Sequence, residues 1–581
     1  MSGRESWSTR HARLMNRLHA RLSTLSRTSP RFAVQTEPRT MGQVGRGRQL
    51  LDGQFLFAGY LVESEDTAPW DLPMPAPRFE AALHGFTWLD DLAADGTGAA
   101  RRRARDWTHD WVRRYGRGKG PGWTPELTAR RLVRCIDHAD VLLHGVRRPV
   151  AEAFRRSLAH QTRFLARRCR ATPRGLPRVE ALTALLLAGL ALEGAQAHAG
   201  PAAKALAREA GQCIDDGGGI ASRNPEELLE IFTLLTWASA ALAESGRAPE
   251  PEQLAAVRRI APTLRALRHG DGGLPRFHGG GRGAEGRLEH ALALSAVRSG
   301  PAEGLAMGFA RLRHGRTSVI LDAAAPPEGE ASANGHASTL ALEVTSGRRP
   351  LIVNCGTGAA FGEKWRRAGR ATASHSTLAL DGFSSARLGV EGLTAGGTAE
   401  LLVDAPTDVR MERHDTDLAN GVIMAHDGYL ATHGLTHVRQ VYLSTDGRSL
   451  QGEDLLVTLE RPDERRFDTA RDQAGGDGVP FKVRFHLHPD VEAEHEGDGR
   501  SIRLRLRSGE VWHFRHPNGA RMSLEASVFL EPGRLSPRAT SQIVLSSSAR
   551  EYATRVAWTL AKAKETPDAV RDLERDELET T

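Results

Sequence analysis

The sequence predicts an α+β protein of two parts, a helical N-terminal half followed by an antiparallel β-sandwich. From about residue 45 to residue 300, apolar residues recur at i, i+3, i+4 and i+7, which is the period of helices with one buried face. From about residue 305 onward, short runs alternate apolar and polar residues and end at Asp-Gly or Ser-Gly turns, as antiparallel strands do. A chain of 581 residues is also too long for a single core.

The helical half shows its pattern most clearly in four segments, which glycine- and proline-rich stretches separate. These segments are 138–146, 179–197, 226–245 and 252–269. Asn224 and Pro225 stand directly before the third segment, where Asn is a favoured N-cap and Pro is tolerated in the first turn. Such helices, joined by glycine-rich loops, suggest helix pairs stacked around a common centre.

The C-terminal half contains ten or more runs with a strand pattern and no helices between them, which predicts an antiparallel sandwich. The runs are 308–323, 338–347, 350–356, 376–382, 399–406, 437–460, 482–494, 501–516, 521–532 and 541–548. We therefore expect a sandwich over 305–561, followed by a charged, disordered tail over 562–581.

Residues 1–45 precede the helical half as a basic arm. The first 50 residues hold ten arginines and two acidic residues, and Leu14, Leu18, Leu22 and Leu25 follow helical spacing. No apolar core follows the basic residues, so this is not a standard secretory signal. We predict a flexible arm in solvent. The alternative is a basic amphipathic helix that contacts an anionic membrane surface or a partner.

Composition narrows the classes of function. The net charge of +7 suits an anionic partner. The alternative is that the arginines only reflect an arginine-rich proteome, since basic and acidic residues are mostly interspersed. No Walker, GxSxG, HExxH or Rossmann motif is present, and no specific nucleic acid is expected. The four cysteines form no CxxC pair, which argues against a thiolate metal site. No run of about 18 apolar residues exists, so the sequence favours the cytoplasm by default, with the periplasm as the alternative.

One polar block, residues 334–381, carries the clearest motifs. It opens with Asn334, His336 and Ser338 ahead of an apolar run, continues to a strand that ends at Asn354, and reaches His375 before another strand. This block resembles the C-terminal module of the heparinase II/III-like family, whose characterised members are mostly polysaccharide lyases. In that family it reads roughly His-x-His-x-Asp, then Val-Asp-x-Gly, then Ala-His-Asn-Thr.

The resemblance implies that the helical half, 46–304, is an incomplete α/α toroid, with a cleft where it meets the sandwich. It also implies a partner and a reaction: an acidic, uronate-containing polysaccharide cleaved by β-elimination. That reaction requires neutralisation of the sugar carboxylate, a base for the C5 proton and an acid for the leaving oxygen.

The resemblance assigns roles to five residues. His336 and His375 would lie at the reacting centre. Arg223 and Asn224 end a glycine-rich loop that resembles a cleft turn of the family, and Arg223 would bind the uronate carboxylate through its forked guanidinium. Asn224 is either a second carboxylate ligand or only an N-cap. Tyr429, in a His-Asp-Gly-Tyr element, would act as the proton carrier.

The family's zinc ligands correspond to His336, Asn354 and His375. A structural zinc is therefore one interpretation. Against it, Asn is a poorer zinc ligand than the family's Asp. A hydrogen-bonded cluster facing the cleft, or two purely structural histidines, are the alternatives.

Further polar residues are candidates for binding the substrate. They are Asn334, Arg366, Arg370, His269, Asp271, His437 and Arg439. Structural roles compete with each: an interhelical loop over 269–281, a solvated basic loop over 365–371, and strand pinning by His437 and Arg439.

The departures from the family motifs define an alternative function. Asn334 replaces the histidine usually assigned to catalysis, and Asn cannot shuttle a proton. The Asn-His motif and the tyrosine expected in the helical half are also missing. A non-catalytic glycan-binding or envelope-associated protein on the same scaffold is therefore the second interpretation.

Overall fold

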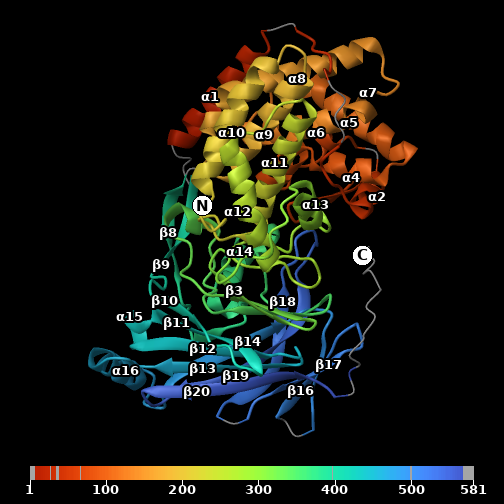
Figure 1. Cartoon of the computed structure of the whole chain (residues 1–581). Coiled ribbons are helices and arrows are strands. Elements are labelled where there is room, and N and C mark those ends of the chain that lie inside the picture. Colours follow the sequence, from red (N-terminus) through yellow and green to blue (C-terminus); the bar gives the residue numbers. More distant parts are fainter. Residues whose placement is uncertain are drawn as a thin grey trace.

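The computed structural model describes residues 7–25, 28–33, 38–65, 67–394, 397–497, 500–517, 519–564 and 566. Helices occupy the N-terminal half and lie on one side of the antiparallel sheets that make up the C-terminal half (Figure 1). The predicted fold class, a toroid-type helical domain followed by a β-sandwich, is confirmed. Most of the tail over 562–581 lies outside the described residues.

The N-terminal arm contains a helix, α1 (Trp7–Ser23), which corrects the prediction of a flexible arm. This helix packs against α8 (Arg148–Arg168), with Ala20 and Ser23 buried. The Arg168 guanidinium donates to the Asn16 side chain at 2.9 Å. Small residues on one face of α1 thus let it lie on α8, while its leucines stay exposed.

The helical domain follows the predicted pattern of helices and loops. Its remaining helices are α2 (Val44–Leu51), α3 (Pro77–Gly85), α4 (Thr87–Asp95), α5 (Gly98–Tyr115), α6 (Pro125–Asp137), α7 (Ala139–Leu143), α9 (Leu176–Ala191), α10 (Ala199–Cys213), α11 (Pro225–Glu244), α12 (Pro251–Leu267) and α13 (Arg287–Leu294). Helix α9 contacts α6, α8, α10 and α11, and is apolar on nearly all sides, as a central helix must be. Within the described residues no helix is long and apolar enough to cross a bilayer.

A hairpin interrupts this domain where only helices were expected. Strands β1 (Gln54–Phe57) and β2 (Tyr60–Glu63) pair around a turn at Ala58 and Gly59. Gly59 has φ +82°, and a Cβ there would come within 1.7 Å of the Ala360 carbonyl oxygen in the sandwich half. Only glycine permits this approach, so the hairpin lies directly on the other domain.

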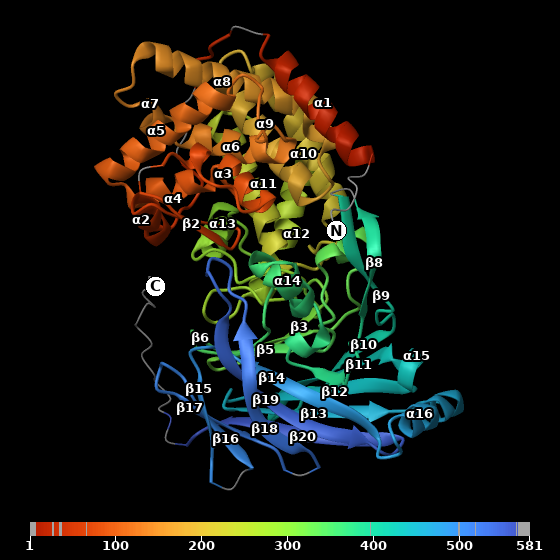
Figure 2. The ribbon, with the colours of Figure 1, turned by 180° about the vertical axis from the view of Figure 1, so that it is seen from behind.

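The sandwich consists mainly of two antiparallel eight-stranded sheets (Figure 2). One contains β3 (Phe309–His314), β4 (Thr317–Asp322), β5 (Leu342–Ser346), β6 (Arg349–Val353), β7 (Leu378–Leu380), β14 (Val479–Leu487), β18 (Arg521–Phe529) and β19 (Arg538–Ala549). The other contains β10 (Val409–Arg413), β11 (Ala419–Tyr429), β12 (Leu435–Ser444), β13 (Ser449–Val457), β15 (Glu492–His495), β16 (Ser501–Arg505), β17 (Val511–Arg515) and β20 (Ala553–Lys562). Strands β8 (Arg387–Thr394) and β9 (Gly397–Val403) form a separate ribbon.

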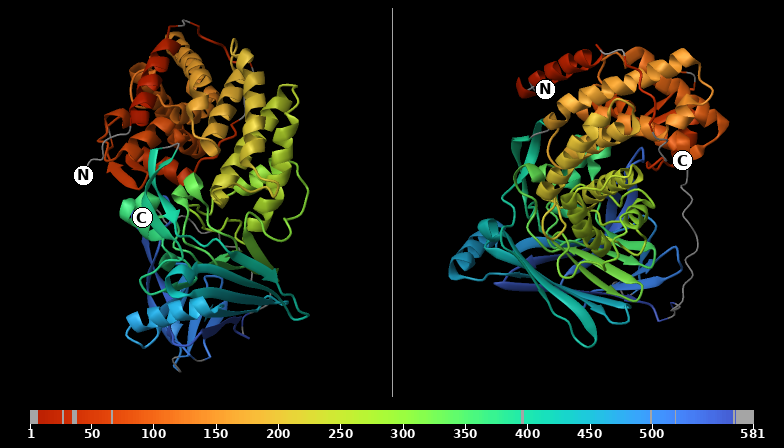
Figure 3. Two further views of the ribbon diagram at one scale, coloured as in Figure 1. Left: turned by 90° about the vertical axis from the view of Figure 1, so that its left-hand side faces the viewer. Right: turned by 45° about the horizontal axis from the view of Figure 1, so that its top comes forward.

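Helices also occur within the sandwich half, which corrects the expectation of strands alone. They are α14 (Glu363–Gly369), α15 (Leu430–His433) and α16 (Arg461–Gln473), besides short 3-10 turns. Helix α16 packs on α15 at one end of the sheets, away from the helical domain (Figure 3). The loops that carry most of the predicted site residues lie between the two halves instead.

Candidate functional site

The site lies at the junction of the two domains and is centred on two imidazoles. His336 Nδ1 and His375 Nε2 are 3.0 Å apart, and His375 Nδ1 is 2.9 Å from the Ala371 carbonyl oxygen. Because that carbonyl can only accept, the His375 proton is assigned to Nδ1, so that His336 donates from its own Nδ1. His336 Nε2 is then left with a lone pair, and no group among the described residues hydrogen-bonds to it.

Both imidazoles are neutral. Burial lowers the pKa of His375 to about 4. Burial, followed by the neighbouring His375, lowers the pKa of His336 well below its usual value. A neutral imidazole with a free lone pair is a weak base, so the pair retains one element of an acid–base site.

A third histidine, His278, joins this pair to the helical domain. Its Nδ1 accepts from the backbone N–H of His336 at 3.2 Å, so its proton lies on Nε2. Nε2 is 3.4 Å from Asp322 Oδ2, and because burial lowers the pKa of His278, it is a neutral imidazole that faces this carboxylate. His278 is fully buried and has φ +47°, a left-handed conformation that few residues other than glycine adopt. The loop over 269–281 therefore reaches the imidazole pair through His278.

Asp322, at the end of β4, is the charged centre of the junction. Burial alone would raise its pKa, but Arg223, His278 and Ser338 together hold the pKa at about 2. Arg223 Nη2 is 2.6 Å from Oδ1, and the Ser338 hydroxyl donates to Oδ2 at 2.7 Å. Asp322 was not predicted from the sequence; the available signal was a carboxylate directly after the apolar run Val319–Leu321.

Arg223 uses its whole guanidinium inside the protein. Besides Asp322, it donates to the carbonyl oxygens of Met307, Gly308, Ala324 and Ala325 at 2.8–3.1 Å. The guanidinium also lies 4.7 Å from the centre of the Phe309 ring. No N–H remains for a sugar carboxylate, which corrects the role expected for Arg223. Next to it, Asn224 accepts from the N–H groups of Glu226 and Glu227 and is therefore the N-cap of α11.

Tyr429 lies in the core of the sandwich, away from solvent. Its hydroxyl donates to the Leu378 carbonyl oxygen at 3.2 Å, and burial raises its pKa above the usual value. A buried phenol without access to substrate cannot move protons in a cleft, so this expectation is corrected. His437 and Arg439 are also fully buried and bind Asp454 at 2.8 Å each, which favours the strand-pinning alternative over substrate binding.

The three candidate zinc ligands do not fit a zinc ion. Asn354 Oδ1 accepts from the Ser376 N–H at 3.0 Å, and its Nδ2 faces Glu343 Oε1 at 3.3 Å. The facing nitrogens of His336 and His375 are already hydrogen-bonded to each other. Across the described residues there is also no group of three or more His, Cys, Asp or Glu side chains that could hold a metal. The two histidines form the hydrogen-bonded pair of the second interpretation, whereas Asn354 bonds to Ser376 and Glu343 and does not join them.

The segment predicted as a basic loop is mostly helix α14, and its two candidate arginines differ, Arg370 being buried and Arg366 partly exposed. Arg370 is buried and donates to the carbonyl oxygens of Ser332, Gly335 and Glu400 at 2.8–2.9 Å, so it has no role at the surface. Arg366 donates to Ala333 and lies 3.3 Å from the Asn334 side chain, which is exposed. Asn334 and Arg366 are thus the substrate candidates that remain accessible in this part of the junction.

The other end of the loop over 269–281 lies against β5. His269 Nε2 is 3.6 Å from Glu343 Oε2, and Asp271 is 3.4 Å from Arg282. His269 is buried, and Asp271 accepts from the Gly273 N–H. These two residues lie beside Glu343 rather than beside the imidazole pair.

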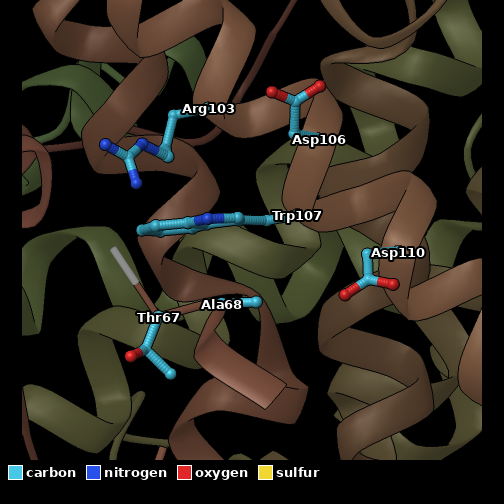
Figure 4. A pocket seen from close by; sticks show the side chains of 6 residues that line it. All are labelled: Thr67, Ala68, Arg103, Asp106, Trp107 and Asp110. Atoms are coloured by element: carbon cyan, nitrogen blue, oxygen red, sulfur yellow. The ribbon is translucent and has the colours of Figure 1, made fainter. Parts of the chain in front are cut away.

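A hollow of about 360 Å³ lies away from all predicted site residues. It is open and lies between α5 and the segment before α3, where Arg103 lies over the Trp107 indole and Asp106 and Asp110 line one side (Figure 4). It was not predicted from the sequence, because Arg103, Asp106, Trp107 and Asp110 belong to an ordinary amphipathic helix.

The comparisons with known proteins agree with the motif block. Residues 296–559 match the family described as Heparinase II/III-like, C-terminal. FtsZ-localized protein C of Caulobacter vibrioides is 33% identical over 532 residues, which cover 89% of this chain and 88% of that protein. The structural match to heparinase III covers 95% of this chain and 89% of the heparinase III chain, with a TM-score of 0.67 at 12% identity. The structural match to heparan sulfate lyase HepC of Pedobacter heparinus covers 96% of this chain and 89% of the lyase chain, with a TM-score of 0.55 at 15% identity. At these identities the solved structures share the fold alone.

Replacing Asp322 should destabilise the whole junction. In Asp322→Asn, Arg223 becomes a buried cation without its carboxylate, and we expect the free energy of unfolding to fall by about 3–5 kcal/mol. Asp404→Asn is the matched control, because Asp404 pairs with Arg387 at an exposed site and should change stability by about 0–1 kcal/mol. Denaturant unfolding measures both; similar losses in the two variants would contradict a central role for Asp322.

Stability should also fall at mildly acid pH. Between pH 6.5 and about 4 the unfolded chain protonates His375 while the folded chain keeps it neutral. Its contribution is complete above pH 6.5 and is lost as pH falls through this range, by at most about 3 kcal/mol. Unfolding free energies measured across this range should depend less on pH in His375→Asn than in the wild type. Equal dependence would show that His375 titrates normally.

Proposed function

This chain belongs to the heparinase II/III-like family, and we propose that it serves there as a binding protein that keeps the lyase scaffold without the lyase reaction. The observation that carries the proposal is the internal use of the groups that β-elimination needs. Arg223 has no free donor, Tyr429 is buried in the sandwich, and Asn334 replaces the histidine usually assigned to catalysis. The remaining imidazole pair alone supplies neither a carboxylate ligand nor an acid.

The proposed partner of this chain is FtsZ. The relative that is 33% identical over most of both chains is named for its localisation with FtsZ. Because that similarity spans both domains, we extend the association with FtsZ to this chain.

A lyase acting on an acidic polysaccharide is the second candidate. One observation favours it: His336 is neutral, and its Nε2 lone pair is not used by any described residue. In such a reaction His336 would take the C5 proton, and Arg366 and Asn334 would face the sugar. A group to protonate the leaving oxygen is still needed.

One preparation of the full chain can separate these two functions. We expect it to sediment with FtsZ polymers and to release no unsaturated product, seen as ultraviolet absorbance, from any uronate-containing glycan. We expect the same absence of product from Asn334→His, since the carboxylate ligand and the acid are still missing. Product from the wild type that disappears in His336→Ala would establish the lyase instead, and failure to sediment with FtsZ would remove the proposed partner.

Helix α1 supplies an attachment surface for the same proposal. Leu14, Leu18 and Leu22 are 63%, 47% and 40% exposed, although α1 is docked on α8 through its other face. Arginines flank this apolar stripe, at positions 10, 13, 17 and 21. An exposed leucine stripe between arginines suits the surface of an anionic membrane, because both the apolar area and the charge are complementary.

Membrane contact through α1 has a simple test. Vesicles containing anionic lipid should bind the wild-type protein, and the double variant Leu14→Glu, Leu18→Glu should lose most of this binding. Leu418→Glu is the matched control, since Leu418 is 79% exposed on the sandwich and should leave binding unchanged. Raising the salt concentration should weaken binding by screening the arginines. Equal binding by the double variant and the control would exclude α1 as the contact.

A further inference from the structure

Strand β10 (Val409–Arg413) is an outer strand of one of the two eight-stranded sheets. It pairs with β11 along one side, and no strand among the described residues pairs with its other side. The side chains of Arg410, Glu412 and Arg413 are exposed there. Unpaired backbone N–H and C=O groups at the edge of a sheet can bind another strand, so this edge is a candidate interaction surface.

The backbone groups on the free side of β10 follow from its register with β11. The His414 N–H donates to the Gly421 carbonyl oxygen at 3.0 Å, in the register of the two strands. Opposite residues of an antiparallel pair alternate between those that exchange both hydrogen bonds and those that exchange none. The N–H and C=O groups of Val409, Met411 and Arg413 therefore point away from β11, toward the free side.

Side chains of opposite charge lie on the outer face of β10. Arg410 and Glu412 are two residues apart and therefore share this face, with Arg410 bound to Asp408 at 2.6 Å. Glu412 forms no ion pair with any described residue. On the opposite face, Val409 and Met411 are half-buried and pack against the core of the sandwich. A strand added at this edge would thus meet one charged face and one apolar face.

The charges select one register for a second copy of β10. Two copies related by a twofold axis pair antiparallel, and the alternation of the free N–H and C=O groups requires the axis to pass through a residue. An axis at Met411 places Arg410 of each copy opposite Glu412 of the other. An axis at Arg410 would place two arginines opposite each other, and an axis at Glu412 two glutamates, which is unfavourable. Strand β10 is therefore complementary to itself about Met411.

The other outer strand of the same sheet, β15, lacks this complementarity. Glu492 and Glu494 are two residues apart and share one face of it. Pairing of two copies of β15 about Ala493 would place these glutamates opposite each other, and such charges protect an edge strand from association. The charge pattern of β10 is thus not a general property of the edges of this sheet.

We propose that β10 is a self-association surface, through which two copies of this chain join their sheets across a twofold axis at Met411. In this dimer Met411 exchanges two backbone hydrogen bonds with its counterpart, and Val409 exchanges two with Arg413 of the other copy. Arg410 and Glu412 form two symmetry-related ion pairs on the outer face, while the half-buried side chains of Val409 and Met411 lose further contact with water. The dimer depends neither on the association with FtsZ nor on the absence of catalysis.

Sedimentation velocity of the full chain tests the proposal. We expect a reversible dimer for the wild type. Arg410→Glu and Glu412→Arg should each weaken this dimer by about tenfold or more, because each substitution replaces two attractive pairs with two pairs of like charge. Arg503→Glu is the matched control, since it reverses a partly exposed charge near the opposite edge of the sheet and should dimerise like the wild type.

Combining the two charge reversals tests the register. The double variant Arg410→Glu, Glu412→Arg should dimerise again, because each ion pair is restored with its charges exchanged. An equimolar mixture of the two single variants should form a mixed dimer, since one copy presents two acids and the other presents two arginines. A wild type that stays monomeric at every concentration, single variants that dimerise like the wild type, or a mixture that stays monomeric would each overturn the proposal.

Discussion

The arrangement of the two domains depends on a buried negative charge. Asp322 is completely enclosed, and removing a carboxylate from water costs several kcal/mol unless cations and hydrogen-bond donors surround it. The helical domain supplies Arg223 and His278, and the sheet domain supplies Ser338. Left-handed backbone at Arg223 and His278 adds a local cost, which these contacts offset. The position of the helical loops on the sandwich follows from this one requirement.

Much of the architecture could be predicted from local patterns. The helical period and the alternation of the strands indicated the two halves, because each pattern reflects one buried face. The hairpin of β1 and β2 was missed because its four-residue strands are too short to show an alternation within a helical region. Helix α16 was missed although Pro462, Asp463 and Glu464 are typical of a helix start, because only Phe467 and Ala470 are apolar residues of its buried face, too few to show a helical pattern. The small residues of α1 likewise gave little sign that they would pack on α8.

The site was only partly predictable, since a motif fixes residue types and not their partners. The meeting of His336 and His375 followed from the motif block. The roles of Arg223 and Tyr429 did not, because they depend on residues far away in the sequence: four backbone carbonyls and Asp322 for the first, the Leu378 carbonyl for the second. No single-sequence pattern shows that a donor is already occupied. Asp322 and Glu343 escaped attention for the same reason, as isolated acids within apolar strands.

Because the Asp322 carboxylate is bound by residues of both domains, it limits where the gene can be divided. The family match begins at residue 296, which suggests that the sheet half is an independent domain. A fragment starting there would carry Asp322 but neither Arg223 nor His278, and would expose the surface on which Gly59 rests. The smallest autonomous folding unit therefore extends well upstream of the recognisable homology, and recombination between relatives would conserve function only when both halves are inherited together.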